Sequence, residues 1–177
     1  LQFKDKRILD FGSGFGVTAN HLAGCNDVTA VEQNTEMLEH RIYDNPYEQI
    51  TGSIDKLKEL EDGSFDVILC HNVLEYVEDR GEFIAEFHRL LKSDGVLSIV
   101  KHNKAGKIMH KAVFENSIQE AMALLSGENA TSQNFGTINE YDIEDLQDYI
   151  AGSFVLDKIC GIRTFYGIQP NSFKSNP

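Results

Sequence analysis

A glycine-rich turn near the start of the chain is the feature that most constrains its fold. An apolar run at 7–11 leads into Gly12, Gly14 and Gly16, and residues 17–23 then carry a helical spacing. This order predicts a strand, a turn and a helix. Glycine fits a turn at which the backbone must approach a ligand closely, because a side chain would obstruct it. Loops of this composition also serve simply to reverse a chain, so the turn alone does not identify a ligand.

The succession of strand and helix continues along the first hundred residues. Phe83, Phe87, Leu90 and Leu91 form one apolar face of a helix that separates two apolar strands. Such alternation predicts an α/β fold, in which helices cover both faces of a mostly parallel sheet and ligands bind beyond the carboxyl ends of its strands. Besides the first strand and helix, we expect strands over 27–32, 65–70 and 95–100 and a helix over 35–43.

The pattern loosens after residue 100. We expect a helix over 105–125, a loop over 126–137, a helix over 142–150 and a sixth strand over 154–160. The chain ends at Pro177 without a further strand, which suggests that the sequence is a fragment or that more chain follows.

The length and composition suit one domain. With 177 residues, of which 41% are hydrophobic, the chain can bury one core and is too short for two generous ones. We therefore predict a single domain over 1–177, with a core over 7–100 and substrate-side elements over 101–170. The sequence has no secretory start and no apolar run near the roughly 18 residues that span a bilayer. We expect no membrane association and a cytoplasmic location.

Metal binding is not expected from the cysteines and histidines. Cys25, Cys70 and Cys160 lie far apart in the sequence, without a C-x-x-C pair and without a histidine at a ligand spacing.

Two acidic residues accompany the turn. Asp10 could attract a cationic group of a ligand, and Glu32 ends the second strand at about the spacing at which an acid binds ribose hydroxyls in dinucleotide folds. The start of the following helix favours an anionic group. Position 17 is valine where the phosphate-binding dinucleotide fingerprint has glycine, which disfavours a pyrophosphate ligand and a nicotinamide-dependent oxidoreductase.

Four stretches of sequence resemble the class I S-adenosylmethionine-dependent methyltransferases of the methyltransferase type 11 kind. They read ILDFGSGFG, VEQN, FDVILCHNVLEYVED and LLKSDGVLSIV and lie within residues 7–100. The resemblance implies a Rossmann-like fold, whose C-terminal strand is missing from this chain. It implies S-adenosyl-L-methionine as cofactor and S-adenosyl-L-homocysteine as product. The cofactor-binding residues that it implies at the first, second and fourth strands are Asp10, Gly12, Ser13, Gly14, Gly16, Glu32, Gln33, His71 and Asn72.

The same resemblance assigns roles to these positions. The turn surrounds the methionine moiety, the acid that ends the second strand binds the ribose, and the pair after the fourth strand lines the methionine end of the cleft. Many relatives place an acid directly after a glycine at the end of the third strand, near the adenine. This chain has Gly52 there and its acid, Asp55, two residues late. Ser53 and Ile54 are the aligned residues, and contact between Asp55 and adenine is left open.

The second half of the chain carries a narrower resemblance. The stretches HNKAGKIMHKAVFENSIQEAM and CGIRTFYG are similar to bacterial methyltransferases that esterify carboxymethoxyuridine at the tRNA wobble position. Lys104, Lys107 and Lys111 would give one helix a basic face, which would attract a phosphate-rich substrate although the net charge of the chain is −12. The alternative interpretation is a solvated lysine face that keeps the helix soluble.

Three residues are candidates for catalysis. Methyl transfer from a sulfonium group chiefly requires a nucleophile in line with the methyl carbon. Arg163 could clamp a substrate carboxylate, and His102 and Tyr166 could orient it; His102 could instead act as a base toward a hydroxyl. The alternative roles are a surface strand residue for Arg163, a strand-end residue bonded to backbone for His102 and a packed aromatic for Tyr166.

These patterns together predict an S-adenosylmethionine-dependent methyltransferase. Its acceptor is either a carboxylate or hydroxyl on a modified tRNA wobble uridine, or an oxygen, nitrogen or carbon atom of a small metabolite. A non-catalytic, S-adenosylmethionine-binding regulatory domain is the alternative from a different class. The sequence indicates neither a membrane partner nor a particular oligomeric state.

Overall fold

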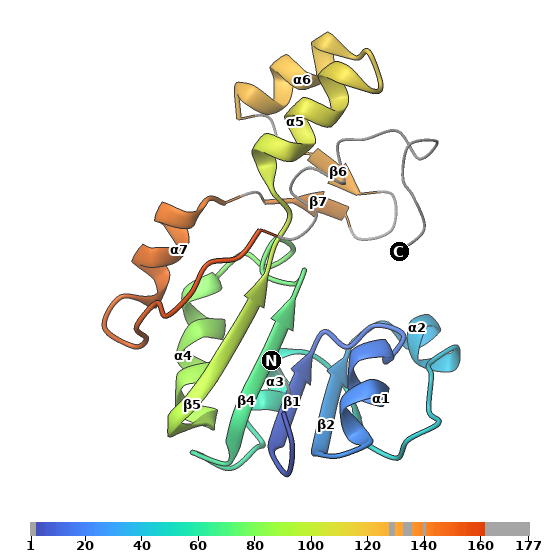
Figure 1. The fold of residues 1–177 in the computed structure, drawn as a ribbon, viewed down its shortest axis with the longest axis vertical. Helices are drawn as coiled ribbons and strands as arrows, with labels where there is room; N and C mark the ends of the chain where they lie inside the picture. Colours follow the sequence, from blue (N-terminus) through green and yellow to red (C-terminus); the bar gives the residue numbers. More distant parts are fainter. Residues whose placement is uncertain (1–2, 128–129, 133–135, 140, 162–177) are drawn as a thin grey trace. The chain divides into compact units, whose positions relative to one another are not determined.

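The computed structural model describes residues 3–127, 130–132, 136–139 and 141–161. The chain divides into two compact units, unit one (residues 1–101) and unit two (residues 102–177), each with its own helices and strands (Figure 1). The assignment of the whole chain to a single domain stays a prediction.

Unit one is built on a five-stranded sheet in which every neighbouring pair of strands is parallel. Its strands are β1 (Arg7–Phe11), β2 (Asp27–Glu32), β3 (Glu48–Thr51), β4 (Phe65–His71) and β5 (Leu91–Val100). They lie in the order β3-β2-β1-β4-β5, of which Figure 1 labels β2, β1, β4 and β5. The order reverses between β1 and β4, the point at which open parallel sheets bind ligands beyond the carboxyl ends of their strands. The predicted α/β, Rossmann-like fold is confirmed.

Helices pack on both faces of this sheet. The helices of unit one are α1 (Val17–Ala23), α2 (Thr35–Glu39), α3 (Ile54–Leu57) and α4 (Arg80–Leu90). On one face, the ring of Phe11 lies 5.6 Å from the rings of both Phe83 and Phe87 of α4. On the other face, Ile8 belongs to a buried cluster with Ala19 of α1. The two faces follow from the alternation of side chains along β1.

Unit two contains helices and a short antiparallel hairpin. Its elements are α5 (Lys104–Val113), α6 (Ile118–Leu125), β6 (Ala130–Ser132), β7 (Gly136–Ile138) and α7 (Ile143–Ile150). The helix expected over 142–150 is confirmed, because Asp142 and Asp145 exchange hydrogen bonds in a capping box that begins α7.

Two predictions for residues 105–137 were wrong. The single helix expected over 105–125 is two helices, because Asn116 adopts a φ of 50°, which an α-helix does not accommodate. The loop expected over 126–137 contains the β6–β7 hairpin. The apolar spacing of α5 and α6 did not reveal the break, since both helices share the same period.

The structure also differs from the prediction at an expected strand and at the end of a helix. No strand is present over 154–160, all of which is described, and the Val155 side chain is 94% exposed there. The apolar run at 154–160 therefore gains no burial from sheet pairing. The helix expected over 35–43 ends at Glu39, since the Ile42 N–H donates to the carbonyl of Phe15 at 2.8 Å and is lost to the helix.

Candidate functional site

The three glycines of the turn all adopt left-handed backbone conformations, with φ of 76° at Gly12, 56° at Gly14 and 72° at Gly16. A methyl group on Gly12 would lie 2.2 Å from Cγ2 of Val73, and one on Gly16 would lie 2.3 Å from the Tyr47 hydroxyl. Packing inside the protein therefore explains these two glycines. Gly14 differs, because a methyl group there would approach no described atom closer than 3.8 Å. Of the three glycines, Gly14 is therefore the one with open space where a side chain would lie.

Glu32, at the end of β2, holds the turn in place. Its Oε2 accepts a hydrogen bond from the N–H of Gly14 at 2.8 Å, and its Oε1 accepts one from the N–H of Asn34 at 2.8 Å. The residue is only 9% exposed. A carboxylate has about four lone-pair sites, so each oxygen keeps capacity for a further donor. Glu32 thus fixes the loop after β1 and retains acceptors for hydroxyl groups of a ligand.

Two buried polar atoms at the turn lack partners in the described part of the chain. They are Oδ2 of Asp10, a residue only 3% exposed, and the hydroxyl oxygen of Ser13. Buried polar atoms are normally hydrogen-bonded, and an exception calls for an explanation such as a missing ligand. A carboxylate and a hydroxyl left unpaired at a glycine turn suit the ammonium and carboxylate groups of an amino acid moiety. The residues present therefore fit the methionine end of S-adenosylmethionine.

Burial raises the pKa of Asp10 to about 7, assisted by the negative charge of Glu32 and opposed by a hydrogen bond from the Ala19 N–H. A cation beside Asp10 would lower this pKa again, because it stabilises the ionised form. The side chain is therefore poised to exchange a proton when a charged group binds.

The loop after β3 lies next to Glu32. The N–H of Gly52 donates to the backbone carbonyl of Glu32 at 3.0 Å, and the N–H of Ser53 donates to Oδ1 of Asp55 at 3.0 Å. The Asp55 carboxylate thus binds its own turn at the start of α3, while Ser53 and Ile54 are half-buried. Through this hydrogen bond Asp55 contacts the loop after β3, although it lies two residues later in the sequence than the acid of many relatives.

The loop after β4 packs against the turn through Val73, whose side chain occupies the space that a side chain on Gly12 would need. His71 ends β4, with its Nε2 3.1 Å from the Ser98 hydroxyl, and burial lowers the pKa of its imidazole. The ring is therefore neutral at pH 7. Asn72 is exposed and has a φ of 57°, and its N–H donates to the Val100 carbonyl at 2.8 Å.

The structure brings together most, but not all, of the predicted residues. The residues from Asp10 to Gly16, Glu32 and the loops after β3 and β4 lie at the carboxyl edge of one sheet. Gln33 is exposed beside them. His102 is exposed in unit two, while Arg163 and Tyr166 lie outside the described residues. The roles of these catalytic candidates stay predictions.

Sequence reasoning missed the residues that shape the turn from a distance. Tyr47 donates its hydroxyl hydrogen to the Ile42 carbonyl at 2.8 Å and thereby blocks the space at Gly16. Met37 and Val73 lie against Gly14 and Gly12. Each comes from a part of the chain outside the turn, so no local pattern in the sequence links it to the glycines.

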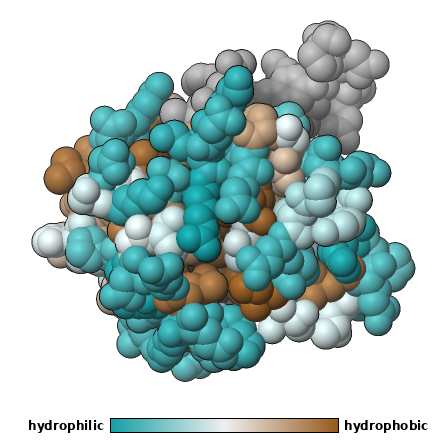
Figure 2. Space-filling model, turned by 90° about the horizontal axis from the view of Figure 1, so that it is seen from below, coloured by the Kyte–Doolittle hydropathy of each residue, from teal (hydrophilic) through white to brown (hydrophobic). Residues whose placement is uncertain are grey.

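A cavity of about 610 Å³ lies at the opposite, amino edge of the sheet. Figure 2 views unit one from this side and shows a surface that is mainly hydrophilic, with smaller apolar areas between the polar side chains. Lys6, Asp66 and Lys92 line the cavity, and both lysines pair with the Asp66 carboxylate. The cavity contains none of the predicted site residues, and its charges neutralise one another.

None of the helices among the described residues is long and apolar enough to cross a membrane. No three histidine, cysteine, aspartate or glutamate side chains of that part of the chain gather as a metal site would require.

Comparison with known proteins points to the same chemistry as the geometry. The sequence profile of the family described as methyltransferase domain matches residues 9–99, just over half of the chain. The ubiquinone biosynthesis O-methyltransferase of Neisseria meningitidis is 31% identical over 112 residues, which are 58% of this chain and 46% of that protein. The chain therefore spans about half the length of the curated relatives that it matches.

Solved structures with the same fold include the YcgJ protein of Bacillus subtilis, with a TM-score of 0.51 and 24% identity over 71% of this chain and 62% of that one. A SAM-dependent methyltransferase from Aquifex aeolicus has a TM-score of 0.51 and 22% identity over 58% of this chain and 60% of that one. At these identities the likeness shows the fold.

Proposed function

We propose that this chain, which belongs to the methyltransferase domain family and is a class I S-adenosylmethionine-dependent methyltransferase, transfers the methyl group to an oxygen atom of a small molecule. The observation that carries the donor site is the pair of unpartnered polar atoms, Asp10 Oδ2 and Ser13 Oγ, beside a turn that has open space at Gly14. The acceptor class comes from relatives that are named O-methyltransferases.

The residues of unit one divide the work of holding the donor. S-adenosylmethionine, when bound, supplies a methyl group on a sulfonium that is an excellent leaving group. Glu32 would accept hydrogen bonds from ribose hydroxyls while it holds Gly14 in place. Asp10 would pair with the ammonium group, and Ser13 would donate its hydroxyl hydrogen to the carboxylate. Ser53 and Ile54 would line the adenine.

A hydroxyl acceptor benefits from a general base, because its oxygen becomes a better nucleophile as it loses its proton. His71 has a neutral imidazole at the carboxyl edge of the sheet. His102 is the base that the sequence predicts. A hydroxyl of the acceptor would give its proton to one of these rings as the new bond to carbon forms.

A tRNA acceptor is the less favoured alternative. Lys111 of the predicted basic face forms ion pairs with Glu115 at 2.6 Å and Glu120 at 2.8 Å. Those contacts neutralise part of the field that would attract phosphates. The wobble-uridine acceptor and the cytoplasmic location stay predictions.

The donor site can be tested by calorimetry with S-adenosylhomocysteine and, separately, with a nicotinamide dinucleotide. We expect the wild type to bind the first ligand and not the second. Gly14→Ala should weaken binding about tenfold or more, because the added methyl group occupies the open space of the turn. Binding of the dinucleotide alone would overturn the proposal.

Gly63→Ala is the matched control for this variant. Gly63 has a φ of 59°, against 56° at Gly14, and a methyl group there would meet no described atom within 4 Å. Both variants therefore carry the same backbone strain, roughly 1–2 kcal/mol. Equal losses of affinity in the two variants would show that strain, and not the site, accounts for the effect.

The acceptor can be tested with a radiolabelled methyl donor and two substrate pools, a small-molecule extract and bulk tRNA. We expect the label in the small-molecule pool, in a methyl ether that is stable to alkali. Label in the tRNA pool would replace our acceptor with the alternative. Donor binding without label in either pool would favour a regulatory domain.

A further inference from the structure

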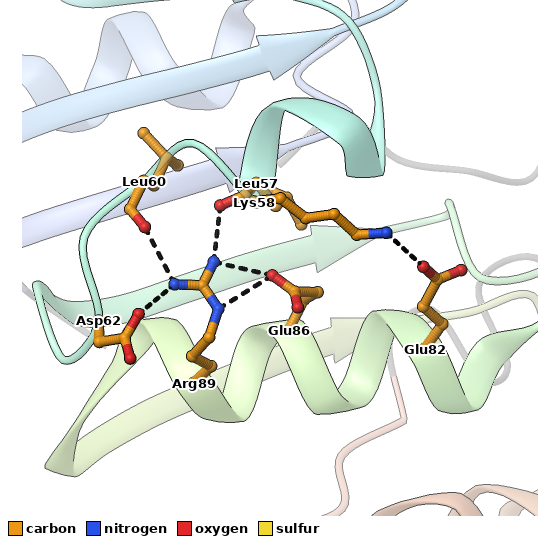
Figure 3. Close-up of polar contacts among 7 residues, drawn as sticks. All are labelled: Leu57, Lys58, Leu60, Asp62, Glu82, Glu86 and Arg89. Carbon is orange, nitrogen blue, oxygen red and sulfur yellow. Dashed lines mark hydrogen bonds and ion pairs between the residues drawn. The ribbon is translucent and has the colours of Figure 1, made fainter.

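The guanidinium group of Arg89, near the end of α4, binds the last residue of α3 and the segment that follows it (Figure 3). Nη2 donates to the carbonyl of Leu57 at 2.8 Å, and Nη1 donates to the carbonyl of Leu60 at 3.0 Å. Glu86, one turn earlier on α4, accepts from Nε at 3.1 Å and from Nη2 at 2.8 Å. Asp62 accepts a further hydrogen bond from Nη1. One side chain thus satisfies two backbone carbonyls and two carboxylates.

This contact matters because α3 is too short to be stable by itself. The helix spans four residues, and isolated helices below about 12 residues are marginal in water. Carbonyls at the end of a helix lack partners within it and favour a cation nearby. Arg89 supplies both a donor and a positive charge there. Burial of Leu57, whose side chain is fully inaccessible, holds the same end of the helix.

The opposite end of α3 carries the residues assigned to adenine. Ile54 is the first residue of the helix, and Ser53 is tied to Asp55 through its N–H. Since only one turn of helix separates these residues from Leu57, a shift at the Arg89 end is transmitted to the adenine end. Gly52 anchors this loop to β2, so α3 is held between a backbone bond at one end and Arg89 at the other.

We propose that Arg89 is a positioning residue for the adenine end of the donor site, which it affects through α3 without touching the ligand. The inference rests on the proposed function. It predicts a selective defect: loss of Arg89 weakens the recognition of adenine and leaves the recognition of the ribose and the amino acid moiety unchanged. The reason is that Asp10 belongs to β1, Ser13 to the glycine turn and Glu32 to β2, and none of them is part of α3.

The test compares two ligands on the wild type and on Arg89→Met. S-adenosylhomocysteine contains adenine, and S-ribosylhomocysteine has the same remainder without the base. We expect Arg89→Met to raise the Kd for the first ligand about tenfold and the Kd for the second less than twofold. Arg89→Lys should behave like Arg89→Met, because an ammonium group cannot bond both carbonyls in the fork geometry of a guanidinium.

Lys58→Met is the matched control. Lys58 also joins the α3 end to α4, through an ion pair with Glu82 at 2.8 Å, but both side chains of this pair are exposed, and Lys58 bonds no carbonyl among the described residues (Figure 3). We expect its ratio of the two Kd values to equal that of the wild type. Glu86→Gln, which removes one anchor of Arg89 and keeps the guanidinium, should give an intermediate ratio and serves if Arg89→Met does not fold.

Hydrogen exchange supplies a readout that needs no ligand. Peptides that cover residues 53–60 should exchange faster in Arg89→Met than in the wild type, with no change in those that cover the glycine turn. Equal weakening of both ligands, or an unchanged ratio with faster exchange, would overturn the inference and leave the donor site intact. Failure of the wild type to bind S-adenosylhomocysteine at all would overturn the proposed function together with the inference.

Discussion

Each edge of the sheet in unit one carries an aspartate, and the two aspartates lie in opposite electrostatic environments. Asp66, at the amino edge, accepts hydrogen bonds from the Arg7 N–H at 2.9 Å and from Lys92 at 2.9 Å. These donors, the Arg7 N–H foremost, lower the pKa of its carboxyl. Asp10, toward the carboxyl edge, is buried with one oxygen unpaired, and its pKa is raised to about 7.

The difference separates a structural site from the proposed binding site. At the amino edge, the protein supplies every partner that the Asp66 carboxylate needs, so the charge contributes to stability. At the carboxyl edge, Asp10 and Ser13 keep unpaired polar atoms whose burial costs free energy until a ligand pairs with them. The cavity of about 610 Å³ does not mark the proposed binding site, because it lies at the amino edge.

The largest expected effect is on donor affinity in Glu32→Ala. The substitution removes the acceptor for the N–H groups of Gly14 and Asn34, and hydrogen bonds to charged groups contribute about 1.5–3 kcal/mol each. We expect the Kd for S-adenosylhomocysteine to rise about 100-fold by calorimetry. Asp66→Asn is the counterpart at the amino edge and should lower the melting temperature without changing the Kd. A Kd that rises equally in both variants would erase the distinction between the edges.

The second effect is on stability as a function of pH. The folded-state pKa of Asp10, about 7, lies above its ordinary value of 3.8, so the unfolded chain releases this proton first as the pH rises. The wild type therefore loses stability between about pH 4 and pH 7, relative to Asp10→Asn, by about 1.4 kcal/mol per pH unit. Urea unfolding at pH 5 and pH 6.5 should show a difference between the two proteins that changes by about 2 kcal/mol. A constant difference would contradict the raised pKa.

The third effect is the proton that Asp10 releases when a ligand binds. A cationic group beside Asp10 favours its ionised form, so the affinity for S-adenosylhomocysteine should rise about tenfold from pH 5.5 to pH 7.5. Calorimetry in two buffers of different ionisation enthalpy measures the released proton directly. Asp10→Asn should bind with no proton release, and release from the variant equal to that from the wild type would assign the proton to another group.

The smallest effect is expected at the amino edge. Lys92→Met removes an ion pair with Asp66 in which the lysine side chain is 42% exposed. Exposed pairs contribute about 0–1 kcal/mol, so the free energy of unfolding should change by no more than that. The affinity for S-adenosylhomocysteine should remain that of the wild type. A loss of donor affinity in this variant would mean that the amino edge takes part in binding.

The sequence by itself determined the parallel architecture of unit one, and it predicted where the donor site would lie. The apolar strands, the intervening helices and the glycine turn are local patterns, because side-chain period and turn chemistry depend on residues close in the chain. The same reasoning failed where a local pattern had to be interrupted. Asn116 breaks a helix whose apolar period continues on both sides, and 154–160 has the composition of a strand but pairs with no strand among the described residues.

Only the tertiary structure decided why each turn residue is what it is. Gly12 and Gly16 are glycines because Val73 and Tyr47 occupy the space of a side chain, whereas Gly14 alone of the three leaves room for a ligand. Glu32 binds the turn that it faces, and Arg89 binds the Leu57 carbonyl of α3 from a position 32 residues later in the chain. Such contacts join residues that are distant in sequence, and a linear pattern carries no record of which loops the folded sheet brings to one edge.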